Sequence, residues 1–204
     1  MKYEWRKMEK DLYGVKQKPE IIDVPSQKFI TIKGMGNPNM DDFSNRVSAL
    51  YSLAYSIKML YKVMMKEESD EKITDFTVYS LEGIWEKLEG DEPDKSKLRY
   101  KIMIKQPDFI ARKIVENAME NIKKKKPNVL YDEIVFESIQ DGKCIQILHV
   151  GSYDSEPDSF KKMDKFARES GLMRSSETHR EIYLSNRNKT PEDDLKTILR
   201  YAVR

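Results

Sequence analysis

An internal duplication constrains the fold of this chain more than any other sequence feature. "KGMGNPNMDDF" (33–43) and "HVGSYDSEPDSF" (149–160) each join an alternating, strand-like segment to a helix-like segment. Both joints contain glycine, a proline near the helix start and an Asp-x-Phe triplet. The copies lie about 115 residues apart, far beyond the period of solenoid repeats. The duplication therefore predicts one unit present twice and related by a pseudo-twofold axis.

Each copy continues in the same order. A helix is predicted over 41–66, where apolar side chains recur every three or four residues, and another over 155–170, with Phe160, Met163 and Phe166 directed inward. "DFTVYSLEG" and "THREIYLSN" then match as strands, and 98–106 supplies a further strand. We expect an α+β fold built from a duplicated strand-helix-strand-strand unit, with antiparallel sheets that form a ligand groove.

The expected boundaries follow from this repeat. The first repeat covers about 28–106, a helix over 107–126 links it to the second, and the second covers about 130–204. Residues 26–204 form a single domain, and residues 1–25 are an arm packed on it. The chain is predicted to end in a helix, because Thr190 suits an N-cap, Pro191 the first helical position and Asp193 a capping box.

Composition excludes several classes of protein. The net charge of +2 gives no attraction to nucleic acid, and no apolar run is long enough to cross a membrane. The single Cys144 excludes a disulfide framework and fits a reducing cytoplasm. His149 and His179 lack metal-ligand spacing, so no metal and no cofactor are expected. We expect a cytoplasmic monomer or weak homodimer whose partner is a small lipophilic molecule, with no direct contact to nucleic acid or membrane.

The most informative candidate site residue is Glu181, in the strand predicted over 178–184. Alternation places His179, Glu181 and Tyr183 on one face, and Ile182 and Leu184 on the other. If the helices cover Ile182 and Leu184, Glu181 faces away from the helix layer and lies at the floor of the groove. There a partly desolvated carboxylate attracts cations or acts as a general base. The alternative is a solvated strand residue paired with a neighbouring lysine.

Several long segments resemble the GyrI-like small-molecule-binding family. They include "SLEGIW", "KLRYKIMIKQPDF", "HVGSYDSEPDSFKKM" and "HREIYLSNRNKTPEDDLKTILRYAVR", and together they extend from about residue 21 to 204. The resemblance implies a carboxylate at the bottom of an aromatic groove, at the position of Glu181, with Tyr183 beside it. Tyr55 and Trp85 match aromatic positions of that groove. Relatives often carry further tryptophans where this chain has Glu86 and Tyr100, which weakens one aromatic wall.

Three further residues are candidate ligand contacts. Met103 has the opposite parity to Ile102 and Ile104, so it faces the groove if those two face the helices. His149 and Tyr153 flank the turn of the second repeat.

The resemblance leaves three functions open. The family's domain serves as the effector-binding half of multidrug-responsive transcription activators, which implies binding of lipophilic, often cationic molecules. Some stand-alone members are hydrolases that open the cyclopropane ring of DNA-alkylating natural products, which implies Glu181 as base and Tyr183 or Tyr55 as acid or hydrogen-bond donor. The family's name also suggests inhibition of a topoisomerase.

Overall fold

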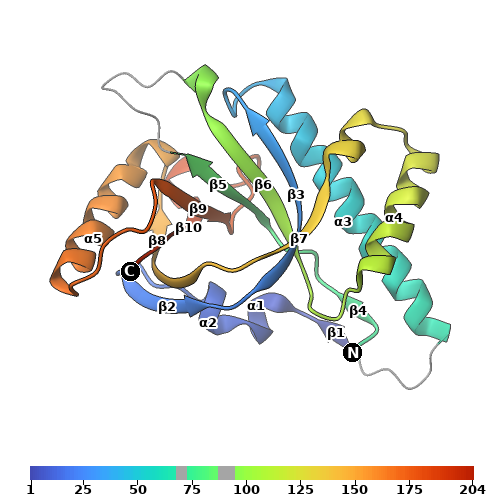
Figure 1. Cartoon of the computed structure of the whole chain (residues 1–204), viewed down its shortest axis with the longest axis horizontal. Helices are drawn as coiled ribbons and strands as arrows, with labels where there is room; N and C mark the ends of the chain where they lie inside the picture. The colour runs from blue at the N-terminus through green and yellow to red at the C-terminus, as the bar shows by residue number, and fades with distance from the viewer. Residues whose placement is uncertain (68–72, 87–94) are drawn as a thin grey trace.

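One eight-stranded sheet dominates the computed structural model, which describes residues 1–67, 73–86 and 95–204 (Figure 1). Its strand order is β2-β8-β10-β9-β5-β6-β3-β7, and all of its strand pairs are antiparallel. The strands of this sheet are β2 (Glu20–Val24), β3 (Gln27–Met35), β5 (Leu81–Glu86), β6 (Arg99–Gln106), β7 (Val135–Ile139), β8 (Gly142–Val150), β9 (Thr178–Tyr183) and β10 (Lys196–Ala202). The helices are α1 (Trp5–Met8), α2 (Lys10–Tyr13), α3 (Asp41–Glu67), α4 (Arg112–Lys125) and α5 (Glu156–Glu169), and β1 (Lys2–Tyr3) pairs with β4 (Asp75–Phe76).

The duplicated unit is present, and it confirms the predicted α+β fold class. One copy is β3-α3-β5-β6, and the other is β8-α5-β9-β10. The strand order is symmetric about the β5–β9 pair, since β3-β6-β5 on one side mirrors β8-β10-β9 on the other. Each copy is also preceded by a strand that pairs with the other copy, because β2 pairs with β8 and β7 pairs with β3. The two halves are thus joined at three places.

The sheet curls into a half-barrel. Only two residues separate β2 from β3, and two separate β7 from β8, although both pairs of strands lie near opposite ends of the strand order. Arg180 on β9 also reaches Gln27 on β3, with 3.4 Å between Nη1 and Oε1, although β5 and β6 lie between them in the sheet. The sheet therefore has a concave inner face and an outer face.

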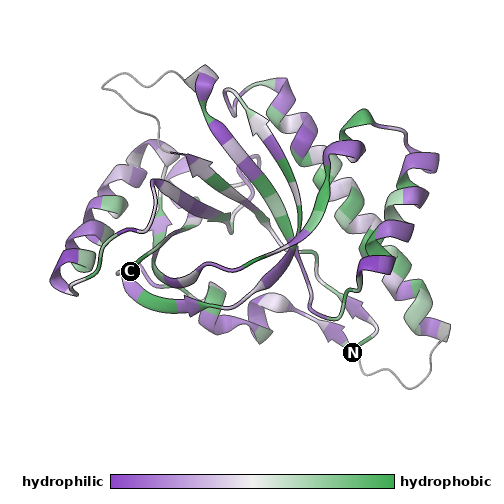
Figure 2. Cartoon of the chain, viewed as in Figure 1, coloured by the Kyte–Doolittle hydropathy of each residue, from purple (hydrophilic) through white to green (hydrophobic). Residues whose placement is uncertain are grey.

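Helices cover the outer face at two separate places. α3 packs on β3 and β6 and is backed by α4, whereas α5 packs on β8 (Figure 1). Figure 2 shows apolar and polar residues alternating along α4 and α5, as expected for helices packed on one side only. The residues that precede β2 lie on the inner face instead, where the carbonyl of Leu12 accepts a hydrogen bond from the buried Arg200.

The predicted C-terminal helix is wrong, because residues 196–202 form strand β10 in the middle of the sheet. The helix-start residues produce only a short 3-10 turn, Glu192–Asp194. β10 is buried on both faces, with Ile198 and Arg200 inside and Leu199 and Tyr201 under α5. A short apolar run of this kind fits a buried strand as well as a helix, so its periodicity does not decide between them. The correction makes the second unit match the first more closely.

Candidate functional site

Glu181 lies at the centre of the outer face. The strand registers place one row of residues side by side on this face, in the order Ile32, Ile102, Gly83, Glu181, Leu199 and Ile147. The α3 helix packs over the first two residues, and α5 packs over the last two. Glu181 and Gly83 therefore lie between the two helical layers, at the boundary of the two repeats.

The prediction that Glu181 faces away from the helix layer is wrong. Its face is the one that carries the helices, whereas Arg180 and Ile182 point into the half-barrel. The assumption that Ile182 must pack against helices caused the error, because Ile182 is fully buried on the inner face instead, in register with Glu82 and Ile198. Glu181 still occupies a distinct position, because the two central strands, β5 and β9, lie between the area covered by α3 and the area covered by α5.

A chain of hydrogen bonds ends on the Glu181 carboxylate. The indole Nε1 of Trp85 donates to the Tyr183 hydroxyl (2.9 Å), which in turn donates to Glu181 Oε2 (2.7 Å). Nε2 of His179 lies 2.8 Å from Glu181 Oε1 and donates to it, because an ionised carboxylate only accepts. Glu181 is 9% exposed, and both oxygens of its carboxylate are hydrogen-bonded. Burial and the adjacent Glu181 raise the pKa of Tyr183, so its hydroxyl keeps its proton.

Aromatic rings surround this chain on both sides. Phe43 from α3, Trp85 from β5 and Tyr100 from β6 form one cluster, with ring centroids 5.1–5.9 Å apart. On the opposite side, Tyr153 meets Tyr183 edge to face at 6.0 Å, and Phe160 meets His179 in the same way at 4.8 Å. Tyr100 thus belongs to the aromatic cluster.

Gly83 makes room for the Trp85 indole. A Cβ atom at residue 83 would lie 2.6 Å from Trp85 Nε1, closer than real Cβ contacts allow. Gly83 is also the register partner of Glu181. The missing side chain therefore lets the indole fold back toward the centre of the row, where it reaches Tyr183.

A second carboxyl group that the sequence did not single out belongs to this region. Glu156 is the first residue of α5 and is only 7% exposed, although acidic residues at helix starts are usually solvated. Burial, followed by the negative charges of Glu181 and Asp154, raises the pKa of Glu156 to about 9. The sequence places Glu156 in the duplicated strand-to-helix joint, which is the one feature that could have pointed to it. Only its burial in the folded structure distinguishes it from the neighbouring acidic residues.

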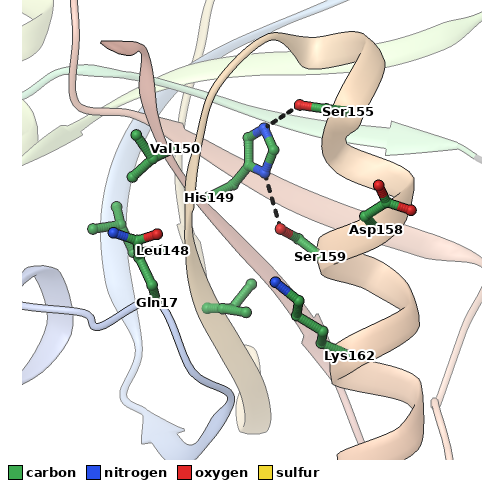
Figure 3. Close-up of a pocket in the computed structure, with 9 residues that line it drawn as sticks. Gln17, Leu148, His149, Val150, Ser155, Asp158, Ser159 and Lys162 are labelled. Carbon is green, nitrogen blue, oxygen red and sulfur yellow. Dashed lines mark hydrogen bonds between the residues drawn. The ribbon is translucent and has the colours of Figure 1, made fainter. Parts of the chain in front are cut away.

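His149 contacts a different set of residues, shown in Figure 3. Its Nε2 lies 2.9 Å from the carbonyl oxygen of Ser152 and must donate to it, so Nδ1 accepts from the Ser159 hydroxyl at 2.9 Å. The ring lines a cavity of about 190 Å³ with Gln17, Lys162 and others, but not with Glu181, Tyr183 or Trp85. Both ring nitrogens are satisfied, which fits a role in tying β8 to α5.

Two other predicted contacts lie apart from Glu181. Met103 is fully buried and pairs with Glu82 and Thr31 on the inner face, so the prediction that it shares the face of Glu181 is wrong. Ile102 and Ile104 face the helices. Because Glu181 also faces the helices, Met103 lies on the opposite face of the sheet from Glu181. Tyr55 is 55% exposed on α3. It lies against Tyr51, whose hydroxyl accepts a hydrogen bond from the Leu81 N–H at 3.1 Å.

The described residues provide no group of three or more His, Cys, Asp or Glu side chains that could hold a metal ion. Within the same ranges, none of the helices combines the length and the apolar character needed to cross a membrane.

Comparison with known proteins identifies the family. Residues 17–204 match the model of the GyrI-like small molecule binding domain. The chain belongs to the GyrI-like family. A search of curated proteins gives no match.

Two solved structures from Listeria innocua are similar over whole chains. One is an uncharacterized conserved protein with 33% identity and a TM-score of 0.87, and the match covers 99% of this chain and 100% of the other. The second is described as a hydrolase and has 32% identity and a TM-score of 0.87, with both chains covered completely. The C-terminal domain of EcmrR has the same fold at 13% identity, with a TM-score of 0.54 over 92% of this GyrI-like chain and 97% of that domain.

Proposed function

We propose that this protein is a hydrolase that adds water to a lipophilic electrophile, with Glu181 as the general base. The observation that carries the proposal is the buried carboxylate of Glu181, oriented by His179 and Tyr183 between two sets of aromatic rings. A base fixed in one orientation and partly removed from water suits abstraction of a proton from a water molecule. The whole-chain similarity to a Listeria protein described as a hydrolase supports the same assignment.

The substrate class that we propose is a flat aromatic compound with a strained cyclopropane ring. The water oxygen forms a bond to a ring carbon while Glu181 takes the proton. The strained C–C bond breaks, and its electron pair passes to the rest of the molecule, which accepts a proton. In this proposal the flat substrate packs against the aromatic rings that flank Glu181, among them Tyr153 and Trp85.

The decisive experiment compares wild type with Glu181→Gln. Each is incubated with a cyclopropane-bearing alkylating agent, and the products are followed by mass spectrometry. We expect wild type to produce the water adduct and the variant to lose the activity by about 100-fold or more, as for removal of a general base. A variant as active as wild type would contradict the role of Glu181, and an inactive wild type would contradict hydrolysis of this class.

Binding without turnover is the second candidate, and the carboxylate between aromatic rings favours it for a lipophilic cation. Tryptophan fluorescence tests it, because the chain has only Trp5 and Trp85. In a Trp5→Phe background, Trp85 is the sole reporter. Saturable quenching by tetraphenylphosphonium, weakened by Glu181→Gln and without any product, would indicate a binding protein.

A further inference from the structure

We propose that Glu156 is the proton donor of this site and that it acts opposite Glu181, the proton acceptor. This inference rests on the proposed hydrolase function and extends it by assigning the second half of the proton transfer. The site has two carboxyl groups, one on β9 and one on α5, and they differ in protonation state. One can take a proton from water while the other supplies a proton to the opened substrate.

The position of Glu156 provides the geometric argument. It begins α5, the helix that covers one side of the row containing Glu181, and Pro157 follows it in the first turn. Its side chain is turned inward, whereas its neighbour Asp158 is exposed and paired with Lys161. The Oε1 atom of Glu156 is buried without a hydrogen-bond partner in the part of the chain that the structure describes. A buried polar atom of this kind is costly unless it has a partner, such as a bound ligand or water.

The surroundings of Glu156 determine its charge. Tyr153, in the 3-10 turn that precedes α5, packs edge to face on Tyr183 of β9, which brings the start of α5 to the strand that carries Glu181. The charges that act on Glu156 within the described residues are both carboxylates, and with burial they raise its pKa to about 9. Glu156 is therefore a neutral acid near pH 7, with a hydroxyl group that can donate.

The proton balance of the reaction then closes within the site. Glu181 takes a proton from the attacking water as its oxygen bonds to the ring carbon. Glu156 gives its proton to the fragment that receives the electron pair of the broken C–C bond. The net change in the substrate is the addition of one water molecule. Transfer of a proton from Glu181 back to Glu156 restores the starting state for another turnover.

A measurement without substrate tests the neutral state of Glu156. The free energy of unfolding is measured by urea denaturation for wild type and Glu156→Gln between pH 4 and 9. Between pH 4.5 and about 9 the unfolded state loses the proton that the folded state keeps, so wild-type stability falls as pH rises. The unfolding constant of wild type should therefore rise relative to that of the variant, by up to about tenfold per pH unit.

Asp158→Asn is the matched control for this measurement, since it removes an exposed acid from the same helical turn. It should not reproduce the divergence with pH. Parallel stability curves for wild type and Glu156→Gln would mean that Glu156 is ionised at neutral pH, and this would overturn the proposal.

Turnover then tests the donor role. We expect Glu156→Gln to lower kcat by about 100-fold or more while KM changes little, because glutamine keeps the shape but cannot supply the proton. Wild-type kcat should fall as pH rises through about 9, and that fall should be absent from the residual activity of the variant. Full activity of Glu156→Gln beside an inactive Glu181→Gln would overturn the donor role and leave the hydrolase assignment intact. An inactive wild type would overturn both.

Discussion

Tyr183 is the single residue that connects Trp85 to Glu181. Its hydroxyl accepts from the indole and donates to the carboxylate, and both partners are otherwise shielded from water. In Tyr183→Phe the Trp85 N–H loses this acceptor, and Glu181 loses one of its two donors. We expect a loss of about 1–3 kcal/mol in the free energy of unfolding, the usual cost of unsatisfied buried polar groups. Urea denaturation measures this loss.

Tyr55→Phe is the matched control, since it removes a hydroxyl from an exposed ring on α3. It should leave stability and activity close to those of wild type. If Tyr183→Phe behaved like Tyr55→Phe in both respects, the hydrogen-bonded chain would not orient Glu181, and the proposed mechanism would lose its positioning group.

The residues that could be recognised from sequence were those defined by strand alternation and family resemblance. Alternation placed His179, Glu181 and Tyr183 on one face, and the structure brings them together with Trp85. Alternation could not show which face of the sheet the helices cover, because Ile182 would be buried in either arrangement. Glu156 escaped notice because acids at a helix start are common, and only tertiary packing buries this one.

At the scale of a strand, Gly83 determines whether β5 can hold the Trp85 indole in the position from which it donates to Tyr183. An alanine Cβ would lie 2.6 Å from Trp85 Nε1, so the indole would have to move and its hydrogen bond to Tyr183 would break. We expect Gly83→Ala to cost about 1–3 kcal/mol of stability, as for other overpacked sites. Urea denaturation checks the cost.

A double-mutant cycle with Trp85→Phe tests whether the indole is the cause. Phenylalanine is smaller and lacks the Nε1 atom, so Gly83→Ala should cost clearly less in that background. An unchanged cost would mean that the backbone of β5, and not the contact with the indole, requires glycine.

Periodicity located several of the elements, since α3, α5, β6 and β9 lie close to the predicted ranges. It did not locate β10, because a central strand buried on both faces has no alternation to distinguish it. The internal repeat was the better guide there. The first copy ends in β5 and β6, so the second should end in two strands as well, and it does.

At the scale of the whole molecule, the stability of the half-barrel depends on the contacts that close its inner face. Glu9, between α1 and α2, accepts hydrogen bonds from Tyr3, Tyr79 and the buried ammonium of Lys105 on β6. The side chain of Glu9 is 13% exposed and that of Lys105 is 6% exposed, so the pair is largely shielded from solvent. This contact ties the first residues of the chain to the sheet.

Glu9→Gln should therefore destabilise the whole domain, because the buried Lys105 loses the carboxylate to which it donates. Breaking a buried ion pair by neutralising one partner costs about 3–5 kcal/mol, which urea denaturation would detect as one cooperative transition at lower denaturant. The exposed pair of Glu4 and Lys7 provides the control, and Glu4→Gln should leave the midpoint unchanged. Adding Lys105→Met to Glu9→Gln removes the unpaired charge and should restore much of the stability. Equal midpoints for Glu9→Gln and Glu4→Gln would mean that the N-terminal residues cover the half-barrel without holding it closed.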